Sequence, residues 1–154
     1  MSVYQSQRCV GTTLKGERCK LRTARGTRCW QHMKKHKKLR IKKSGVPNGG
    51  LGLYTTERIR KGKSIGKYKG EKMSRAQVDA RYRGKRGDYV LCKSKKKCID
   101  GRKSNSSAVR FVNDSRGTKK RNNTKLTGSF TAKATRNIPQ NSELFAAYGR
   151  DYWK

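Results

Sequence analysis

Three cysteines and one histidine near the start of the sequence have the residue types and the spacing of a zinc site. Cys9, Cys19, Cys29 and His32 follow the pattern C-x9-C-x9-C-x2-H. Three thiolates and one imidazole satisfy the tetrahedral coordination of structural zinc, and a segment with so few aliphatic residues needs a metal in order to fold. We therefore expect Zn2+ here. His36 is an alternative fourth ligand, and free thiols in a flexible arm are the alternative to a metal.

A short internal repeat surrounds two of these cysteines. KGERC (residues 15–19) and RGTRC (residues 25–29) lie ten residues apart, each with a glycine three residues before its cysteine. Turn glycines at these positions suit two loops that carry ligands. The run KKHKK (residues 34–38) is typical of a solvated charge run or of a linker. We expect a small basic zinc module at residues 1–37 and a body at residues 38–154.

A second group of residues that could do chemistry lies in four segments of the body. These are GGLGLY (49–54), YKGE (68–71), RFVNDS (110–115) and ELFAAYGRDYW (143–153). Glycine pairs and Tyr-Gly usually mark turns, so any one segment alone is a weak signal. Together they offer tyrosines and an Asn-Asp-Ser cluster beside short apolar runs, and the fold must bring them together if they form one site.

The elements that carry these segments are mostly short strands. From residue 39, apolar runs recur between Gly, Asn, Asp and Ser, which is typical of a β-rich fold. The expected strands are 39–44, 50–56, 64–70, 89–94, 98–101, 109–113, 129–138 and 143–149. Only residues 74–84 look helical, with Ser74 as the N-cap and Gly84 as the end. The pattern predicts a mainly β body, and a generic barrel would show the same pattern.

The charge of the chain is extreme. It has 42 Lys and Arg against 9 Asp and Glu, a net charge of +33, and only 31% of its residues are hydrophobic. Such a surface should bind polyanions, with nucleic-acid phosphate first and an anionic membrane a distant second. No run is long enough to cross a bilayer and the first residues lack a signal peptide, so we expect an intracellular protein. In a reducing compartment five cysteines, an odd number, argue against a disulfide scaffold and favour metal binding or free thiols. Cys92 and Cys98 are expected to be packed or free.

In their order and spacing the four segments resemble the SET domain of protein lysine methyltransferases, and CIDG (98–101) shortly before RFVN adds to the match. The resemblance covers residues 39–154. It implies a SET fold of short β-sheets with little helix and a knot-like C-terminal active site, preceded here by the small zinc-binding module. The compact size looks most like the minimal SET proteins of large DNA viruses, and the cysteine pattern resembles a small Cys3His motif found beside other domains in such viruses.

The resemblance also implies a site for S-adenosylmethionine. Gly50 and Gly52 would let backbone approach this cofactor, Asn113 would bind its methionine end, and the Tyr148 hydroxyl would orient the lysine amine and the methyl group. The full set of implied cofactor residues is Gly50, Leu51, Gly52, Arg110, Phe111, Asn113, Asp114, Tyr148 and Trp153.

Two further tyrosines are implied to form walls of the lysine channel. They are Tyr68 and Tyr89, although Tyr89 could equally be a half-buried strand aromatic. Both histidines lie outside the body and none of the implied site residues is a strong general base. The lysine would then lose its proton to solvent, and catalysis would come from positioning and preorganised electrostatics.

Three departures from the family pattern affect these expectations. The family usually has His where Asp114 stands. If that position contacts the adenine through its backbone, as we favour, Asp can replace His with little loss of cofactor affinity. If the imidazole ring of the usual His makes the contact, cofactor affinity drops. NSEL (141–144) replaces the usual GEEL, a turn change that Asn tolerates. A cysteine-rich segment after the domain is missing, and Tyr152 with Trp153, or a second subunit in a homodimer, would complete the channel.

The expected function is that of an S-adenosylmethionine-dependent protein-lysine N-methyltransferase acting on histones or another basic protein. The basic arm would bind nucleosomal DNA and so overcome repulsion between a +33 protein and basic tails. The expected location is the host nucleus or a viral factory, with packaging in the virion as an extension. The alternative is a catalytically inactive SET-derived protein that binds nucleic acid or packages it in a virion.

Overall fold

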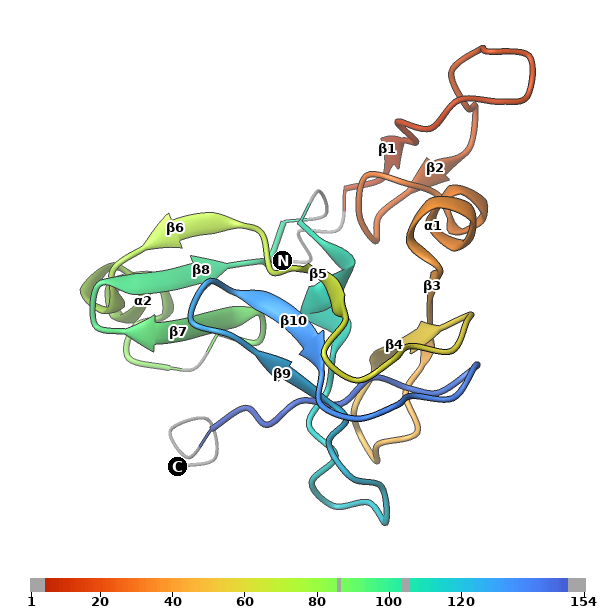
Figure 1. The fold of residues 1–154 in the computed structure, drawn as a ribbon. Coiled ribbons are helices and arrows are strands. Elements are labelled where there is room, and N and C mark those ends of the chain that lie inside the picture. Colours follow the sequence, from red (N-terminus) through yellow and green to blue (C-terminus); the bar gives the residue numbers. More distant parts are fainter. Residues whose placement is uncertain (1–4, 86, 104–105, 150–154) are drawn as a thin grey trace.

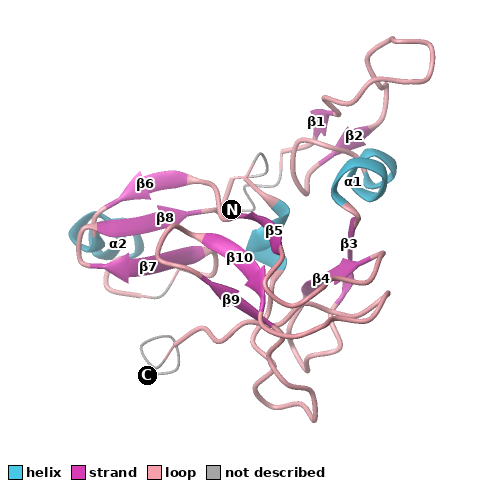
Figure 2. Cartoon of the chain, in the orientation of Figure 1, coloured by secondary structure: helices cyan, strands magenta, loops and turns pink. Residues whose placement is uncertain are grey.

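The structure is a computed structural model that describes residues 5–85, 87–103 and 106–149. In these ranges the chain is mainly β, with short strands, long loops and little helix (Figures 1 and 2), which confirms the predicted fold class. The strands are β1 (Gln7–Arg8), β2 (Arg22–Thr23), β3 (Leu39–Lys43), β4 (Leu51–Thr55), β5 (Ser64–Lys67), β6 (Glu71–Met73), β7 (Val90–Ser94), β8 (Lys97–Asp100), β9 (Thr124–Leu126) and β10 (Thr131–Ala134). The helices are α1 (Trp30–Lys37), α2 (Arg75–Tyr82) and a 3-10 helix, η1 (Ala108–Phe111).

The strands form four small antiparallel sheets. Their orders are β1-β2 in the N-terminal module, and β3-β4, β5-β10-β9 and β6-β8-β7 in the body. Figure 1 shows the module at one end of the molecule and the β6-β8-β7 sheet, with α2 beside it, at the other. The β5-β10 pair joins segments more than sixty residues apart in sequence, so the central sheet depends on long-range contacts.

The last described segment threads between three other parts of the chain. Glu143 forms a bridge with Tyr54, Phe145 with Asn113, and Ala146 with Thr124. The N–H of Leu144 donates to the Leu53 carbonyl at 2.7 Å, and that of Ala146 donates to the Asn113 carbonyl at 2.9 Å. The strand expected at 143–149 is therefore wrong, because successive residues pair with different segments instead of with one neighbouring strand.

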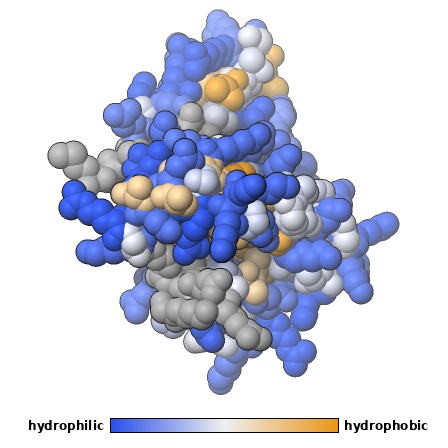
Figure 3. All heavy atoms as spheres, turned by 90° about the vertical axis from the view of Figure 1, so that its left-hand side faces the viewer, coloured by the Kyte–Doolittle hydropathy of each residue, from blue (hydrophilic) through white to orange (hydrophobic). Residues whose placement is uncertain are grey.

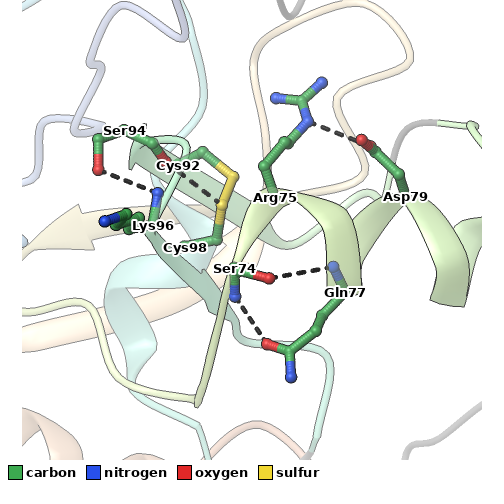
Figure 4. The surroundings of a disulfide bond; sticks show 8 residues. All are labelled: Ser74, Arg75, Gln77, Asp79, Cys92, Ser94, Lys96 and Cys98. Carbon is green, nitrogen blue, oxygen red and sulfur yellow. Dashed lines mark hydrogen bonds and ion pairs between the residues drawn. A yellow bond between two sulfur atoms is a disulfide. The ribbon is translucent and has the colours of Figure 1, made fainter.

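Helix α2 forms where it was predicted. The Ser74 side chain accepts from the Gln77 N–H at 3.2 Å and the Gln77 side chain accepts from the Ser74 N–H at 2.8 Å, which makes a capping box (Figure 4). At the other end Arg83 and Gly84 adopt φ angles of 52° and 71°, which end the helix.

Two local expectations need correction. The basic run at 34–38 is a solvated charge run, as one alternative expected, because all five residues are exposed, but it is no linker. Most of it belongs to α1, which buries His32 and Met33 and places its lysines in the last turn, where cations favour the helix dipole. The strand expected at 109–113 is the helix η1, whose Val109, Arg110 and Phe111 are all buried. A short apolar run does not distinguish a strand from a helical turn buried on every side.

One core connects the module to the body. Leu53, Phe111, Ile138 and Leu144 are its largest fully buried side chains, and Met33 of α1 belongs to the same cluster. The buried Arg110 side chain also donates to the Ala24 carbonyl at 3.5 Å. The N-terminal module is thus packed on the body and does not extend from it as a free arm.

Cys92 of β7 and Cys98 of β8 form a disulfide across the strand pair, beside the start of α2 (Figure 4). The expectation that both are packed or free thiols is therefore wrong for this pair. The two residues are direct cross-strand partners in the β7-β8 register, which brings their side chains together. The pairing could not be predicted from the sequence, because a separation of six residues does not show which residues of the two strands lie opposite each other.

The surface is strongly hydrophilic. Figure 3 shows charged and polar side chains over most of the face at the β6-β8-β7 end. Neither α1 nor α2 is long or apolar enough to cross a bilayer, and the described ranges hold no other α-helix.

Candidate functional site

A cavity of about 500 Å³ collects most of the predicted site residues. It lies where the loop before β4, η1 and the threaded C-terminal segment meet. The predicted residues in its wall are Gly50, Leu51, Tyr89, Arg110, Phe111, Asn113, Asp114 and Tyr148. Its size is in the range of small-molecule and cofactor sites. Trp153, also predicted to bind cofactor, lies outside the described residues, as does Tyr152.

Asn113 is fixed on several sides. Its side-chain N–H group donates to the Leu51 carbonyl at 2.9 Å and, more weakly, to the Glu143 carboxylate at 3.4 Å. Its side-chain oxygen accepts from the Tyr148 hydroxyl at 3.1 Å. These contacts set the amide orientation, so its position at the cavity wall is determined by β4 and the threaded segment together.

The Tyr148 hydroxyl is held by acceptors of Val112 and Asn113. It lies 2.9 Å from the Val112 carbonyl and 3.1 Å from the Asn113 side-chain oxygen, and its single proton serves these acceptors. The ring lines the cavity. A hydroxyl held in this way has a lone pair that can accept a hydrogen bond from an amine entering beside it.

Asp114 engages Tyr148 through its side chain, which sequence reasoning missed. One carboxylate oxygen accepts the Tyr148 backbone N–H at 2.9 Å, and the other accepts the Arg116 N–H at 3.0 Å. The residue is buried. The carboxylate therefore links the segment after Asn113 to the segment that carries Tyr148, independently of any backbone contact that position 114 makes with a cofactor.

Glu143 is a second buried carboxylate that the sequence did not single out. It accepts from the Ser44 hydroxyl at 2.5 Å, the Gly45 N–H at 2.9 Å and the Tyr54 hydroxyl at 3.0 Å. Burial, followed by the hydrogen bond with Glu143, raises the pKa of the Tyr54 hydroxyl. Through Asn113, this network supports the cavity wall from behind.

The two predicted glycines have different roles. Gly50 lines the cavity and adopts a φ of 61°, a conformation that favours glycine. Gly52 lies outside the cavity wall, and a Cβ there would come within 2.1 Å of a Glu143 carboxylate oxygen. Gly52 thus leaves room for Glu143, and the structure gives it no place beside a cofactor.

The two channel tyrosines also differ. Tyr68 is buried and its hydroxyl donates to the Tyr89 carbonyl at 2.6 Å, outside the cavity wall. Burial raises the pKa of its hydroxyl well above the usual range, which keeps it protonated. Tyr89 lines the cavity, packs edge-on against Phe111 with ring centres 6.0 Å apart, and lies near the Arg110 guanidinium. Tyr68 therefore supports the Tyr89 backbone from behind.

The four predicted zinc ligands converge in the module. The ligand atoms of Cys9, Cys19, Cys29 and His32 all lie within 4.8 Å of one another, and all four residues are buried. Tetrahedral Zn–S bonds of about 2.3 Å place sulfurs roughly 3.8 Å apart, so the cluster could hold one such ion. The ring of His36 stacks on that of His32 at 5.8 Å and does not join the cluster.

The surroundings of the cluster suit a metal-bound imidazole and thiolates. His32 presents Nδ1 to the Cys9 and Cys29 sulfurs at 3.5 and 3.3 Å, while Nε2 lies 2.8 Å from the Thr12 carbonyl, which orients the ring. A Cβ at Gly11 would fall within 2.5 Å of the His32 ring, so glycine is required there. Burial opposes ionisation of Cys9, but N–H groups of Cys29 and Gly11 donate to its sulfur and lower the pKa to about 7.

The last described segment threads between other parts of a β-rich fold, and a cavity of the size of a cofactor site lies beside it. These two features are the setting in which the family comparison is to be interpreted. A family model described as the SET domain matches residues 50–149, well over half of the chain. The chain therefore belongs to the SET domain family, a methyltransferase-type family that uses S-adenosylmethionine. A comparison with curated proteins gave no match.

Proposed function

We propose that this protein is a protein-lysine N-methyltransferase that uses S-adenosylmethionine and acts on histones in chromatin. The observation that carries the proposal is the position of Tyr148, whose ring lines the cavity while its hydroxyl is fixed against Val112 and Asn113. A fixed hydroxyl at this wall can orient an attacking amine, and such alignment is the main requirement of a one-step transfer.

The residues around the cavity fit S-adenosylmethionine, which supplies an activated methyl group when bound. Asn113 and the backbone of the Gly49–Gly50 turn offer polar groups, and Tyr89 and Phe111 offer aromatic surface. The Asp114 carboxylate already accepts two N–H groups, so it is poorly placed to act as a base. We propose that the lysine loses its proton to solvent and that Tyr148 then orients the neutral amine.

We further propose that Zn2+ orders the module through Cys9, Cys19, Cys29 and His32, and that the module helps the protein to bind nucleosomal DNA. Residues 1–37 contain ten Lys or Arg and one acidic residue, Glu17. Phosphate contacts would hold the enzyme near a histone tail despite the repulsion between two basic proteins. The host nucleus or a viral factory is the proposed location.

The second candidate function is an inactive SET-derived protein that binds or packages nucleic acid. The net charge of +33 and the presence of Asp114 in place of His favour it. Methyl transfer from labelled S-adenosylmethionine separates the two proposals, with recombinant nucleosomes, free histones and DNA alone as parallel substrates and Tyr148→Phe as the control. Label on histones that depends on Tyr148 supports the enzyme; cofactor-independent DNA binding without any label supports the alternative.

A further inference from the structure

Within the part of the chain that the structure describes, the large apolar side chains with high exposure all belong to the N-terminal module. Among the described residues the large hydrophobics with high exposure are Val10, Leu14, Leu21 and Trp30, and all four lie before residue 38. Large hydrophobic side chains of the described body are at least partly covered. Single exposed hydrophobic side chains are common on protein surfaces, so only one with a defined setting indicates a binding site.

Trp30 stands out within this group. It is the first residue of α1, and 61% of its surface is exposed. Its ring borders a hollow of about 370 Å³ between α1 and the turn at Thr56 and Glu57. The Thr56 N–H donates to the Lys38 carbonyl at 2.9 Å, which fastens this turn to the end of the helix.

The ring is presented from a rigid support. The opposite side of α1 is anchored by Met33 in the body's core and by His32 in the metal-ligand cluster. A fixed aromatic surface loses little conformational entropy when a planar group stacks on it, so an exposed ring held in this way is suited to binding.

The charges around Trp30 indicate the kind of partner. Lys34 and Lys35 border the same hollow. Lys38 also borders it but pairs with Glu57 at 3.3 Å, so its charge is partly compensated there. An aromatic surface flanked by lysines is the combination that binds single-stranded nucleic acid, because bases stack on the ring while phosphates meet the cations.

We propose that Trp30 is a stacking platform for an unpaired base, and that Lys34 and Lys35 contact the phosphates next to that base. This inference rests on the nucleic-acid binding proposed for the module. That binding requires only the positive charge of the module. Stacking adds a preference for single-stranded or unpaired segments over an intact duplex, whose bases are already stacked on each other.

The test uses the whole 154-residue chain with Trp153→Phe, which leaves Trp30 as its sole tryptophan because the chain has two. The fluorescence of Trp30 is followed during titration with oligo-dT, oligo-U, a duplex of equal length, and heparin as a polyanion without bases. We expect the single strands to quench the fluorescence strongly, and heparin to bind with little quenching. The oligo-dT and oligo-U arms distinguish DNA from RNA as the source of the base.

Substitutions separate stacking from charge. Trp30→Ala should weaken oligo-dT binding roughly 5- to 150-fold, the equivalent of about 1–3 kcal/mol per stacked base, without changing heparin affinity or the salt dependence. Trp30→Phe should retain part of the affinity. Lys34→Ala should instead make the negative slope of log K against log salt shallower, by about 0.7 for each phosphate that the protein no longer neutralises. Leu14→Ala is the matched control, because Leu14 is an exposed apolar residue of the same module outside the hollow.

Several outcomes would overturn the inference. The first is an unchanged oligo-dT affinity in Trp30→Ala, provided that its far-UV spectrum and metal content are also unchanged. The second is an equal loss of affinity for heparin and for oligo-dT. The third is self-association, seen in sedimentation, that Trp30→Ala abolishes. The last result would assign the ring to a contact between two copies. If Lys34→Ala weakens duplex binding while Trp30→Ala has no effect, the charge-based tether stands and only the stacking fails; if stacking is found but histones are not methylated, the proposed enzyme fails instead.

Discussion

At the scale of single residues, the cavity wall depends on two carboxylates that accept hydrogen bonds from other parts of the chain. Asp114 holds the backbone of Tyr148, and Glu143 reaches Asn113. Neither contact follows from residue type alone, because an Asp in a turn and a Glu in a loop are usually solvated. Buried carboxylates with several donors are strongly tied to their surroundings, so substitutions here test the site without touching the proposed substrate.

Tyr148→Phe removes the hydroxyl that contacts Val112 and Asn113 while it leaves the ring in the cavity wall. Loss of one positioned transition-state hydrogen bond typically lowers turnover about 10²- to 10³-fold. We expect a fall of this size in methyl transfer, with little change in cofactor affinity or Tm. Calorimetric cofactor binding beside the transfer assay checks both. Near-full turnover in Tyr148→Phe would show that the hydroxyl does not orient the amine.

Asp114→His restores the residue usual in the family, but an imidazole has one acceptor nitrogen where the carboxylate accepts from both Tyr148 and Arg116. At least one N–H then loses its partner, at a cost of about 1–3 kcal/mol if it stays buried. We expect a lower Tm together with reduced turnover, and a smaller effect in Asp114→Asn. Urea unfolding and methyl transfer measure the two effects. Equal or higher activity in Asp114→His would show that position 114 acts through its backbone alone.

At the scale of elements, the site is built where β4 meets the threaded segment, and Gly52 makes this contact possible. Gly52→Ala would place a methyl group against Glu143, and overpacking of this kind costs about 1–3 kcal/mol. We expect Glu143→Ala to relieve part of that cost, so the double variant should lose less stability than the sum of the single ones. Denaturant unfolding of the four proteins gives the coupling.

Gly50→Ala provides the comparison for this cycle. Its φ of 61° makes alanine unfavourable by about 1–2 kcal/mol, but no atom lies near the position where the Cβ would stand. Its cost should therefore be independent of Glu143. Strictly additive costs for Gly52→Ala and Glu143→Ala would mean that the carboxylate moves aside without loss.

Sequence reasoning predicted the elements whose signals are local. Strands β3, β4, β7 and β8 lie within the expected ranges or one residue from them, and the Ser74 cap starts α2. Strands β5 and β10 were also predicted, although they pair across a long stretch of sequence. Helix α1, which buries Met33 in the body's core, was missed, and the last segment pairs with three different neighbours instead of forming the expected strand. The Cys92–Cys98 disulfide depends on the β7-β8 register, which composition does not reveal.

Much of the candidate site could also be predicted from local sequence motifs. Residues of three of the four motifs line one cavity, whereas none of the YKGE motif (68–71) lies in its wall. The four candidate metal ligands were chosen from their spacing, and their ligand atoms converge. Glu143 and the side-chain role of Asp114 could not be found, since their partners are Ser44, Gly45 and Tyr148, which lie far away in the sequence.

At the scale of the whole molecule, the module and the body are mechanically connected. Met33 comes from the helix that also carries His32, and it packs in the body's core. Arg110, a residue of the cavity wall, donates to the carbonyl of Ala24 in the module. The metal-ligand cluster and the cofactor cavity therefore share supports, although they lie in different parts of the fold.

We therefore predict that removal of zinc weakens the body as well as the module. Purified protein should contain about one zinc per chain, and a chelator or Cys19→Ser should release it, expose the N-terminal residues to protease, lower the Tm of the body and weaken S-adenosylmethionine binding. Met33→Ala is the control, because it should destabilise the body by about 2–5 kcal/mol while zinc stays bound.

Metal analysis, limited proteolysis and calorimetric cofactor binding on the same samples decide this prediction. Because removal of residues 1–37 would also remove Met33 from the core, chelation is a cleaner perturbation than truncation. The coupling is wrong if chelation makes the N-terminus protease-sensitive but leaves the Tm of the body and its cofactor affinity unchanged. The metal assignment itself is wrong if the protein is free of metal and its N-terminus is equally resistant to protease.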